Sequence, residues 1–304
     1  MSDTPPSLAK NADAGTDPAV DADQPSRSGR PGPAPTPFGS VDAVRVRGVT
    51  KTFGSRKNQV TALSEVDLTV PSGEFVALIG PSGCGKSTLM RLVADLEQPS
   101  DGSIEVFGKT ATQARKDQDY GIAFQQAGLL PWRTVSGNIG LPLELHGASR
   151  AERKSRVAEL VELVGLGDFA KSHPDQLSGG MQQRVAIARS LAERPRLLLM
   201  DEPFGALDEM TRERMQAELA RIAQETGAAV IFVTHSIPEA VFLADRVVVM
   251  SARPGRITGQ IVTGIAREVT RDQSLREDPA FFAKVTEVRE ALHGAPASGG
   301  AEER

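Results

Sequence analysis

The sequence has a single cysteine, Cys84, no long apolar run and no excess of one charge sign. One cysteine excludes an internal disulfide and any metal site built from several cysteines, as suits a reducing compartment. No apolar stretch approaches the roughly 20 residues of a membrane-spanning helix, and the N-terminus lacks a secretory signal. The net charge of −4 gives no electrostatic case for nucleic acid. We therefore expect a cytosolic protein without a nucleic-acid partner.

Apolar residues occur in two strand patterns. From Val41 onward they alternate with polar residues, and residues 60–70 and 104–107 also read as strands. The runs 75–79, 197–200, 230–233 and 247–250 are instead apolar throughout. Continuous runs of this kind are typical of strands buried on both faces of a largely parallel sheet.

Three helices have recognisable starts. Ser149 and Glu152 have capping-box spacing, and an apolar stripe follows them. Thr211 is the predicted N-cap of a second helix that ends at Gly227. The dipeptide at 278–279, Asp-Pro, predicts the N-cap and first residue of a third helix that ends near Leu292.

A glycine-rich stretch, GPSGCGKST, follows the first buried strand and matches G-x-x-x-x-G-K-[ST]. In this pattern backbone N–H groups hold phosphates, Lys86 reaches the β/γ oxygens and Ser87 coordinates Mg²⁺. We assign the whole stretch to nucleotide binding: Gly80, Pro81, Ser82, Gly83, Cys84, Gly85, Lys86, Ser87 and Thr88. A redox role for Cys84 stays open beside the simpler interpretation of a tolerated small residue, since no resolving cysteine exists.

An acidic pair, Asp201 and Glu202, ends another buried strand. Ligands of open α/β sheets bind at the carboxyl ends of the strands, so Asp201 is placed to organise magnesium and Glu202 to activate water as a general base. Two acidic residues at the start of a loop are the alternative interpretation.

Between these two stretches lies LSGGMQQR, residues 177–184, which resembles the signature of the ABC (ATP-binding cassette) family. The resemblance implies an α/β fold: a RecA-like mixed or parallel sheet core, an N-terminal antiparallel β-subdomain and an α-helical signature subdomain. It places the ATP-binding domain at 41–265, with the helical subdomain at about 126–190. Around it we expect a disordered leader (1–40), a C-terminal helical extension (266–292) and a disordered tail (293–304).

The same resemblance implies further site residues. Gln125 matches the glutamine loop that senses the γ-phosphate and Mg²⁺, with Gln126 a weaker candidate, and His235 matches the switch histidine that contacts the γ-phosphate. Phe53 matches the position that stacks on adenine, although a core phenylalanine would look the same. Two subunits would pair head to tail as a homodimer. The residues expected to act across that ATP sandwich are Ser178, Gly179, Gly180 and Asp208.

Three further stretches narrow the family to a branch: LLPWR at 129–133, FGALDEMTRERMQ from Phe204, and ADR with ARPGR at 244–256. They resemble ATPases of importers for nitrate, sulfonates, taurine, and pyrimidine or thiamine precursors. The resemblance implies an ATP- and Mg²⁺-dependent ATPase on the cytoplasmic side of the cell membrane. It would bind integral-membrane permease subunits near Trp132, served indirectly by an extracytoplasmic solute-binding protein. A soluble, non-transport ABC ATPase is the alternative.

Overall fold

The computed structural model describes residues 41–54, 58–265 and 273–294, which belong to one compact unit of the chain. The predicted leader at 1–40 lies outside the described residues, as does residue 295 onward of the predicted tail. Within the described ranges, no helix has the length and apolar character needed to cross a bilayer.

The bounds of the elements follow from the backbone hydrogen bonds. In the described ranges the strands are β1 (Asp42–Phe53), β2 (Val60–Pro71), β3 (Phe75–Ile79), β4 (Asp101–Val106), β5 (Lys109–Thr110), β6 (Tyr120–Ala123), β7 (Leu197–Asp201), β8 (Ala229–Val233), β9 (Arg246–Met250) and β10 (Ile257–Val262). The helices are α1 (Lys86–Val93), α2 (Ala111–Asp117), α3 (Val135–Ile139), α4 (Leu141–Leu145), α5 (Arg150–Leu163), α6 (Gly179–Ser190), α7 (Glu209–Thr226), α8 (Ile237–Leu243), α9 (Gln273–Arg276) and α10 (Pro279–Gly294), with 3₁₀ turns at Gly167–Phe169 and Pro174–Gln176.

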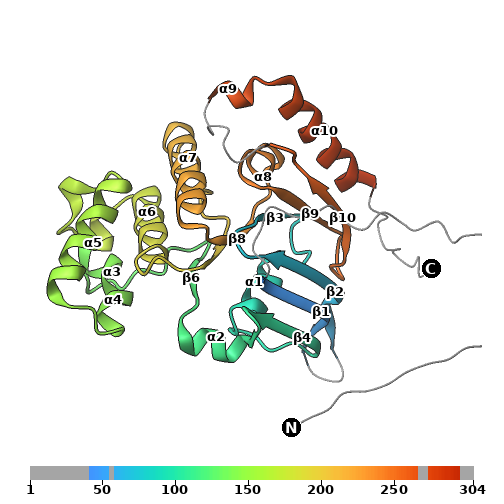
Figure 1. Cartoon of the computed structure of the whole chain (residues 1–304), viewed down its shortest axis with the longest axis horizontal. Helices are drawn as coiled ribbons and strands as arrows, with labels where there is room; N and C mark the ends of the chain where they lie inside the picture. Colours follow the sequence, from blue (N-terminus) through green and yellow to red (C-terminus); the bar gives the residue numbers. More distant parts are fainter. Residues whose placement is uncertain (1–40, 55–57, 266–272, 295–304) are drawn as a thin grey trace, which may run out of the picture. The chain divides into compact units, whose positions relative to one another are not determined.

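The strands form two sheets (Figure 1). One is antiparallel, in the order β2-β1-β4-β5. The other has the order β10-β9-β3-β8-β7-β6, in which β9, β3, β8, β7 and β6 run parallel and β10 pairs antiparallel with β9. This confirms the predicted fold class, a mixed sheet core joined to an N-terminal antiparallel sheet.

Successive side chains of the central strands enter two different hydrophobic clusters. In β3, Phe75 and Ile79 pack with the helical side of the sheet, while Val76 and Leu78 pack with α1 and the antiparallel sheet. Because side chains alternate across a strand, a sheet covered on both faces needs apolar residues at every position. The continuous apolar runs of the sequence are therefore strands buried on both faces, as predicted.

Helix α1 lies between the two sheets. Its Leu89, Met90, Leu92 and Val93 are at most 1% exposed, and they share a cluster with residues of β1, β2 and β3. Each fully buried side chain of this size contributes roughly 1.5–3 kcal/mol of transfer free energy. The packing holds the start of α1, and hence the glycine-rich loop before it, in a fixed place.

The predicted helix starts are right in two cases and wrong in one. Ser149 and Glu152 form a full capping box at α5, and α10 begins at Pro279 behind Asp278. The N-cap of α7 is Asp208, not Thr211: Oδ1 of Asp208 accepts from the Thr211 amide at 2.9 Å. Aspartate is a stronger N-cap than threonine. Asp208 lies three residues before Thr211, so the helix begins directly after Asp208 and Thr211 falls in its first turn.

Strand β6 is short and was not predicted from the sequence. Its Gly121 lies directly against the end of α6, where a Cβ would come 2.0 Å from the Ser190 carbonyl oxygen and 2.9 Å from Cγ of Pro195. A residue with a side chain at this place must push the strand away from the helix.

Gly121→Ala is expected to lower the free energy of unfolding by about 1–3 kcal/mol, because the added methyl overpacks the contact with Ser190. Gly259→Ala is the matched control: it is also a strand glycine, but its Cβ would meet Val249 at an ordinary 3.9 Å. Urea unfolding of both variants measures the difference. Equal midpoints for the two would contradict the close approach of β6 and α6.

Candidate functional site

The glycine-rich loop joins β3 to α1. Gly85 is the N-cap of α1 with a φ of 106°, and a Cβ there would come 2.6 Å from Cδ2 of Leu63. Only glycine adopts this conformation and fits this contact without strain. The loop is thus held at the N-terminus of α1, where backbone N–H groups and the helix dipole favour an anion such as phosphate.

Lys86 and Cys84 are buried within this loop. Nζ of Lys86 donates to the carbonyl oxygens of Gly80, at 2.8 Å, and Pro81, at 3.1 Å, and lies 3.7 Å from Sγ of Cys84. The Lys86 ammonium therefore stays inside the loop that is predicted to hold phosphates. Cys84 is a free thiol, 1% exposed, which favours the interpretation of a small residue that fills the loop.

Ser87 and Asp201 lie side by side. Oγ of Ser87 donates to Oδ1 of Asp201 at 2.9 Å, and Asp201 is 3% exposed at the end of β7. Burial raises the pKa of Asp201, while the bond from Ser87 and the charge of Lys86 oppose that rise. A hydroxyl and one carboxylate are hard oxygen donors of the kind that Mg²⁺ prefers when phosphates supply its other ligands. This pair fits the predicted magnesium site.

Glu202, Gln125 and His235 converge although they are far apart in the sequence. Nε2 of Gln125 donates to Oε2 of Glu202 at 3.3 Å, and Nδ1 of His235 lies 3.2 Å from the same oxygen. Gln125, not Gln126, makes this contact. The Glu202 side chain is 22% exposed and that of His235 68%. A carboxylate held between an amide and an imidazole at an open edge is suited to orienting a water molecule.

Glu202 also has an unusual backbone. Its φ is 45°, in the left-handed region that costs a residue with a side chain on the order of 1–3 kcal/mol. The Glu202 amide donates to the Val233 carbonyl at 2.9 Å, and the Glu202 carbonyl accepts from Gly205 at 3.2 Å. These bonds hold the strained conformation, which turns the chain sharply as β7 ends.

Phe53 ends β1 and is 39% exposed, so it is not a core residue. Nζ of Lys51 lies 4.7 Å from the centroid of its ring and also pairs with Glu97 at 3.0 Å. The exposed ring is available for stacking. Its role in adenine binding remains a prediction.

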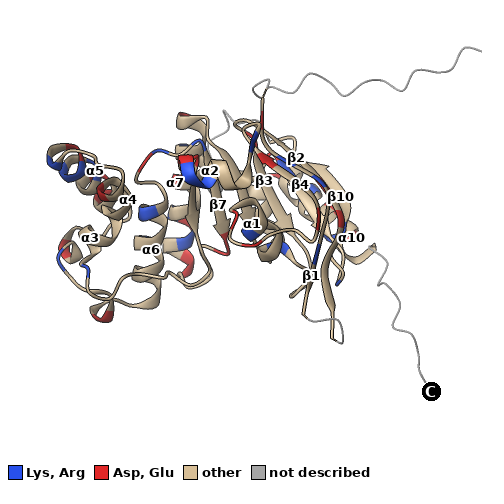
Figure 2. Cartoon of the chain, turned by 90° about the horizontal axis from the view of Figure 1, so that it is seen from below, with Lys and Arg blue, Asp and Glu red and all other residues tan. Residues whose placement is uncertain are grey.

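Helix α6, which begins directly after Ser178, lies apart from α1 in both views (Figures 1 and 2). Ser178 caps α6, its Oγ accepting from the Met181 amide at 3.3 Å. A Cβ on Gly180 would lie 3.1 Å from the Ala206 carbonyl, whereas one on Gly179 would meet no atom within 4 Å. Asp208 caps α7, and its hydrogen bonds with Thr211 lower its pKa.

Arg253 is a contact of the glycine-rich loop that motif analysis missed. Its Nε and Nη2 both lie 3.3 Å from the Gly83 carbonyl oxygen. Gly255 of the same segment packs on the loop so closely that a Cβ would come 2.0 Å from the Cys84 carbonyl. The signal was available: β9 is parallel to β3 and adjacent to it, so the segment after β9 lies beside the segment after β3.

Comparisons with known proteins identify the family. The ABC transporter family matches residues 63–205. The chain is 46% identical over 237 residues to the taurine import ATP-binding protein of Rhizobium johnstonii, covering 77% of this chain and 90% of that protein. The chain belongs to the ABC transporter family. It is also 41% identical over 255 residues to the nitrate import ATP-binding protein of Synechocystis sp., covering 83% of this chain and 95% of that protein.

A solved dimeric structure of an ATP-binding cassette, in a post-hydrolysis state bound to ADP and Pi, is similar to this ABC protein. The TM-score is 0.66 at 35% identity, covering 72% of this chain and 98% of that chain. The family resemblance and the fold read from the sequence are confirmed. As a member of this family, the protein is an ATPase that uses ATP with Mg²⁺.

Arg253→Ala is expected to weaken ATP binding about fivefold, because the Gly83 carbonyl loses a charged donor and the loop loses a nearby positive charge. Arg256→Ala is the control, since Arg256 lies in the same segment but bonds to Glu65 and Ser64. Titration with a fluorescent ATP analogue measures both affinities. Equal affinities for the two variants would contradict a role for Arg253 at the loop.

Proposed function

We propose that this chain is the ATP-hydrolysing subunit of an importer for a small solute, either an anion of the nitrate, sulfonate or taurine type or a pyrimidine-type vitamin precursor. The observation that carries the ATPase chemistry is the meeting of Gln125 and His235 on Glu202, beside the Ser87–Asp201 pair. The import function is supported by the identity to relatives named as taurine and nitrate import ATP-binding proteins.

Each residue has a role that follows from its position. The glycine-rich loop and Lys86 bind the phosphates, while Ser87, Asp201 and Gln125 provide oxygen ligands for Mg²⁺, which neutralises phosphate charge when bound. Glu202 orients and deprotonates the attacking water, a contribution of about 10² to 10⁴ in rate. His235 and Gln125 hold the Glu202 carboxylate toward the γ-phosphate.

The second half of the site comes from another copy of the chain. Ser178, Gly179 and Gly180 form a helix start that is favourable for an anion, and open space surrounds Gly179. Because they lie apart from the glycine-rich loop of their own chain, they act on ATP that the partner copy holds. The dimeric cassette structure with ADP and Pi supports this homodimeric arrangement.

Glu202→Gln is expected to bind ATP with nearly unchanged affinity, to lose hydrolysis by about 10² or more and to accumulate as an ATP-bound dimer. Ser178→Arg should bind ATP as a monomer but not dimerise, since its long cationic side chain occupies the space of the partner's γ-phosphate. Size-exclusion chromatography with light scattering and a phosphate-release assay measure both properties. Wild-type turnover in Glu202→Gln would contradict the general-base role, and ATP-driven dimers of Ser178→Arg would contradict the head-to-tail pairing.

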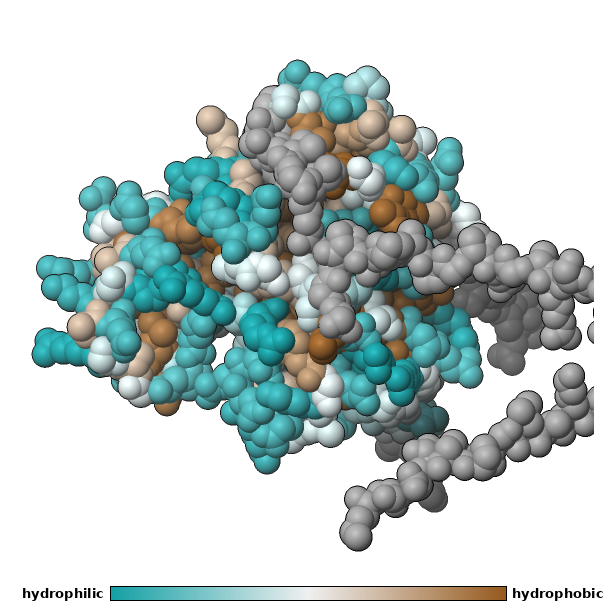
Figure 3. Space-filling view, in the orientation of Figure 1, coloured by the Kyte–Doolittle hydropathy of each residue, from teal (hydrophilic) through white to brown (hydrophobic). Residues whose placement is uncertain are grey.

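A membrane permease is the proposed partner of the helical part of the chain, which places the protein peripherally on the cytoplasmic side of the membrane. An extracytoplasmic binding protein would deliver the solute to that permease. Three large hydrophobic side chains of this part are exposed: Trp132 (71%), Leu145 (73%) and Phe169 (40%). In the space-filling view, exposed hydrophobic residues form scattered patches among hydrophilic ones (Figure 3). Single exposed side chains this large suit insertion into a partner.

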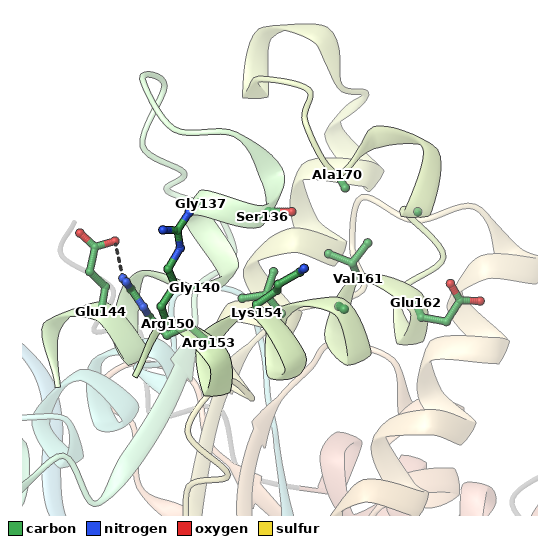
Figure 4. Close-up of a pocket in the computed structure, with 13 residues that line it drawn as sticks. Ser136, Gly137, Gly140, Glu144, Arg150, Arg153, Lys154, Val161, Glu162 and Ala170 are labelled. Carbon is green, nitrogen blue, oxygen red and sulfur yellow. Dashed lines mark ion pairs between the residues drawn. The ribbon is translucent and has the colours of Figure 1, made fainter. Parts of the chain in front are cut away.

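Residues close in sequence to these side chains line a cavity of about 840 Å³ (Figure 4). Residues of α3, α4 and α5 line it, with Val157 and Val161 as an apolar part and Arg150, Arg153 and Lys154 as a basic rim. Glu144 on the same rim lies 3.5 Å from Arg153. The cavity suits a short cytoplasmic helix of a permease that carries both apolar and acidic residues.

Trp132→Ser is expected to reduce co-purification of the permease at least about tenfold while leaving ATP binding unchanged, because a buried tryptophan anchor contributes 2 kcal/mol or more to binding. Phe282→Ser is the control, an exposed aromatic on α10. The measurement is quantitative mass spectrometry of proteins retained by the tagged chain, in the Glu202→Gln background with ATP and mild detergent. Recovery of soluble partners without any integral-membrane protein would instead support a non-transport ABC ATPase.

A further inference from the structure

A cluster of polar side chains is buried next to the segment that carries His235. Thr234 and Gln216 are 2% exposed and Glu239 is 8% exposed, and none of them belongs to a nucleotide-binding motif. Thr234 directly follows β8, Gln216 lies in the middle of α7, and Glu239 lies in the first turn of α8. Burying an acid and an amide in a hydrophobic core is costly unless each polar atom is bonded.

The C-terminal extension enters this cluster through Arg276, the last residue of α9. Nη2 of Arg276 donates to Oε1 of Gln216 at 2.5 Å, and its guanidinium lies 4.1 Å from the ring centroid of Phe242. Arg276 also lies 3.7 Å from Glu213. The side chain of Arg276 is only 22% exposed, so the extension is anchored to α7 and α8 by a largely covered cation.

Arg276 sets the orientation of the Gln216 amide. A guanidinium has only donors, so the Gln216 atom that faces it must be the carbonyl oxygen. The amide nitrogen of Gln216 then faces Glu239, and it donates to Oε1 at 2.8 Å. Thr234 donates to the other oxygen, Oε2. Burial raises the pKa of Glu239, and the bonds from Thr234 and Gln216 oppose that rise.

At Thr234, further hydrogen bonds hold the backbone on both sides of His235. Oγ1 of Thr234 accepts from the Ser236 amide at 3.0 Å, and Oγ of Ser236 accepts from the Glu239 amide at 3.4 Å. The Thr234 amide in turn donates to the Leu78 carbonyl at 3.2 Å. His235 itself makes its side-chain contact with Glu202 from this braced segment.

Two charged or titratable groups act on Glu239: Arg212 from α7 and His235 from the segment after β8. Arg212 lies one turn before Gln216 on α7, and its charge favours the Glu239 carboxylate, as does His235. Nη2 of Arg212 donates to the Leu207 carbonyl at 2.7 Å. Helix α7 therefore bonds to the segment 204–208 through Arg212. One turn later, through Gln216, it bonds to Glu239, which supports the His235 segment.

We propose that Arg276, Gln216 and Glu239 are positioning residues for His235, so that the C-terminal extension sets how His235 faces Glu202. The proposal rests on the role given to His235 under the proposed function. It assigns the extension a part in hydrolysis rather than only in covering the core. Gln216 and Thr234 both donate to Glu239, and Arg276 holds the Gln216 amide in place, so loss of Arg276 frees Gln216 and weakens the support that Glu239 gives to Thr234.

Two variants of the full chain test this. Arg276→Met keeps the apolar stem but leaves the Gln216 oxygen without its donor. Glu239→Met removes both acceptor oxygens while keeping an unbranched stem, so Thr234 and Gln216 both lose their bonds to this side chain. Both should lower kcat for ATP hydrolysis about tenfold, because a small misplacement of a catalytic side chain is costly. KM for ATP should stay within about twofold, since the glycine-rich loop is untouched.

Arg289→Met is the matched control, because Arg289 is exposed on α10 of the same extension. It should keep wild-type kcat. A merely structural effect would lower the fraction of chains that bind ATP without changing kcat per bound nucleotide, so binding stoichiometry is measured on every variant. Unchanged kcat per site in both test variants, or an equal loss in Arg289→Met, would overturn the proposal.

Hydrogen exchange tests the hydrogen bonds around Thr234 and Ser236 independently of the role proposed for His235. The Ser236 amide, which donates to Thr234, should exchange faster in both test variants and at the wild-type rate in Arg289→Met. Unchanged exchange over residues 234–236 would overturn the proposal by itself. His235→Ala is assayed alongside: wild-type turnover in that variant would contradict the proposed role of His235, a failure distinct from that of the bonding network.

Discussion

The adjacency of three parallel strands, β3, β8 and β7, is the constraint on which the site depends. Their carboxyl ends carry the glycine-rich loop, His235 and Glu202. Backbone hydrogen bonds tie these ends together beyond the strands: the Thr234 amide donates to Leu78, and the Glu202 amide donates to Val233. Because the sheet is buried on both faces, a slip by one residue would send each side chain into the opposite cluster and disrupt the packing of both. The geometry of the candidate site is thus fixed by the core.

Sequence patterns predicted the structure correctly where a pattern is typical of only one kind of element or site. Continuous apolar runs predicted the central strands, and the motifs predicted Lys86, Ser87 and Glu202 at one edge, because the carboxyl ends of parallel strands meet there. Strands β6 and β10 were missed because each contains a glycine, which weakens the strand pattern, and β6 has only 4 residues. Their pairing is decided by a neighbouring strand, which a local pattern does not reveal.

Gln216 and Glu239 could not be predicted for a different reason. On a helix, a polar residue is normally read as solvent-facing. Gln216 lies among charged residues of α7, whereas Glu239 is the one polar residue of α8. Their burial depends on partners 23 positions apart, and on Arg276 a further 60 positions from Gln216. Arg253, by contrast, could have been placed beside the glycine-rich loop once β9 was recognised as parallel to β3.

The left-handed backbone of Glu202 shows how the fold uses the rigidity of its core. A φ of 45° is unfavourable for glutamate, yet it lets the chain leave β7 at a sharp angle and still return through Gly205 to the cap of α7 at Asp208. Asp201 before the turn faces Ser87, and Glu202 at the turn faces Gln125 and His235. Two neighbouring carboxylates thereby reach different partners. An extended backbone would also separate them, because successive side chains point to opposite faces of a strand, but one of the two would then enter the core. The strained turn keeps both carboxylates at the edge where a nucleotide can reach them.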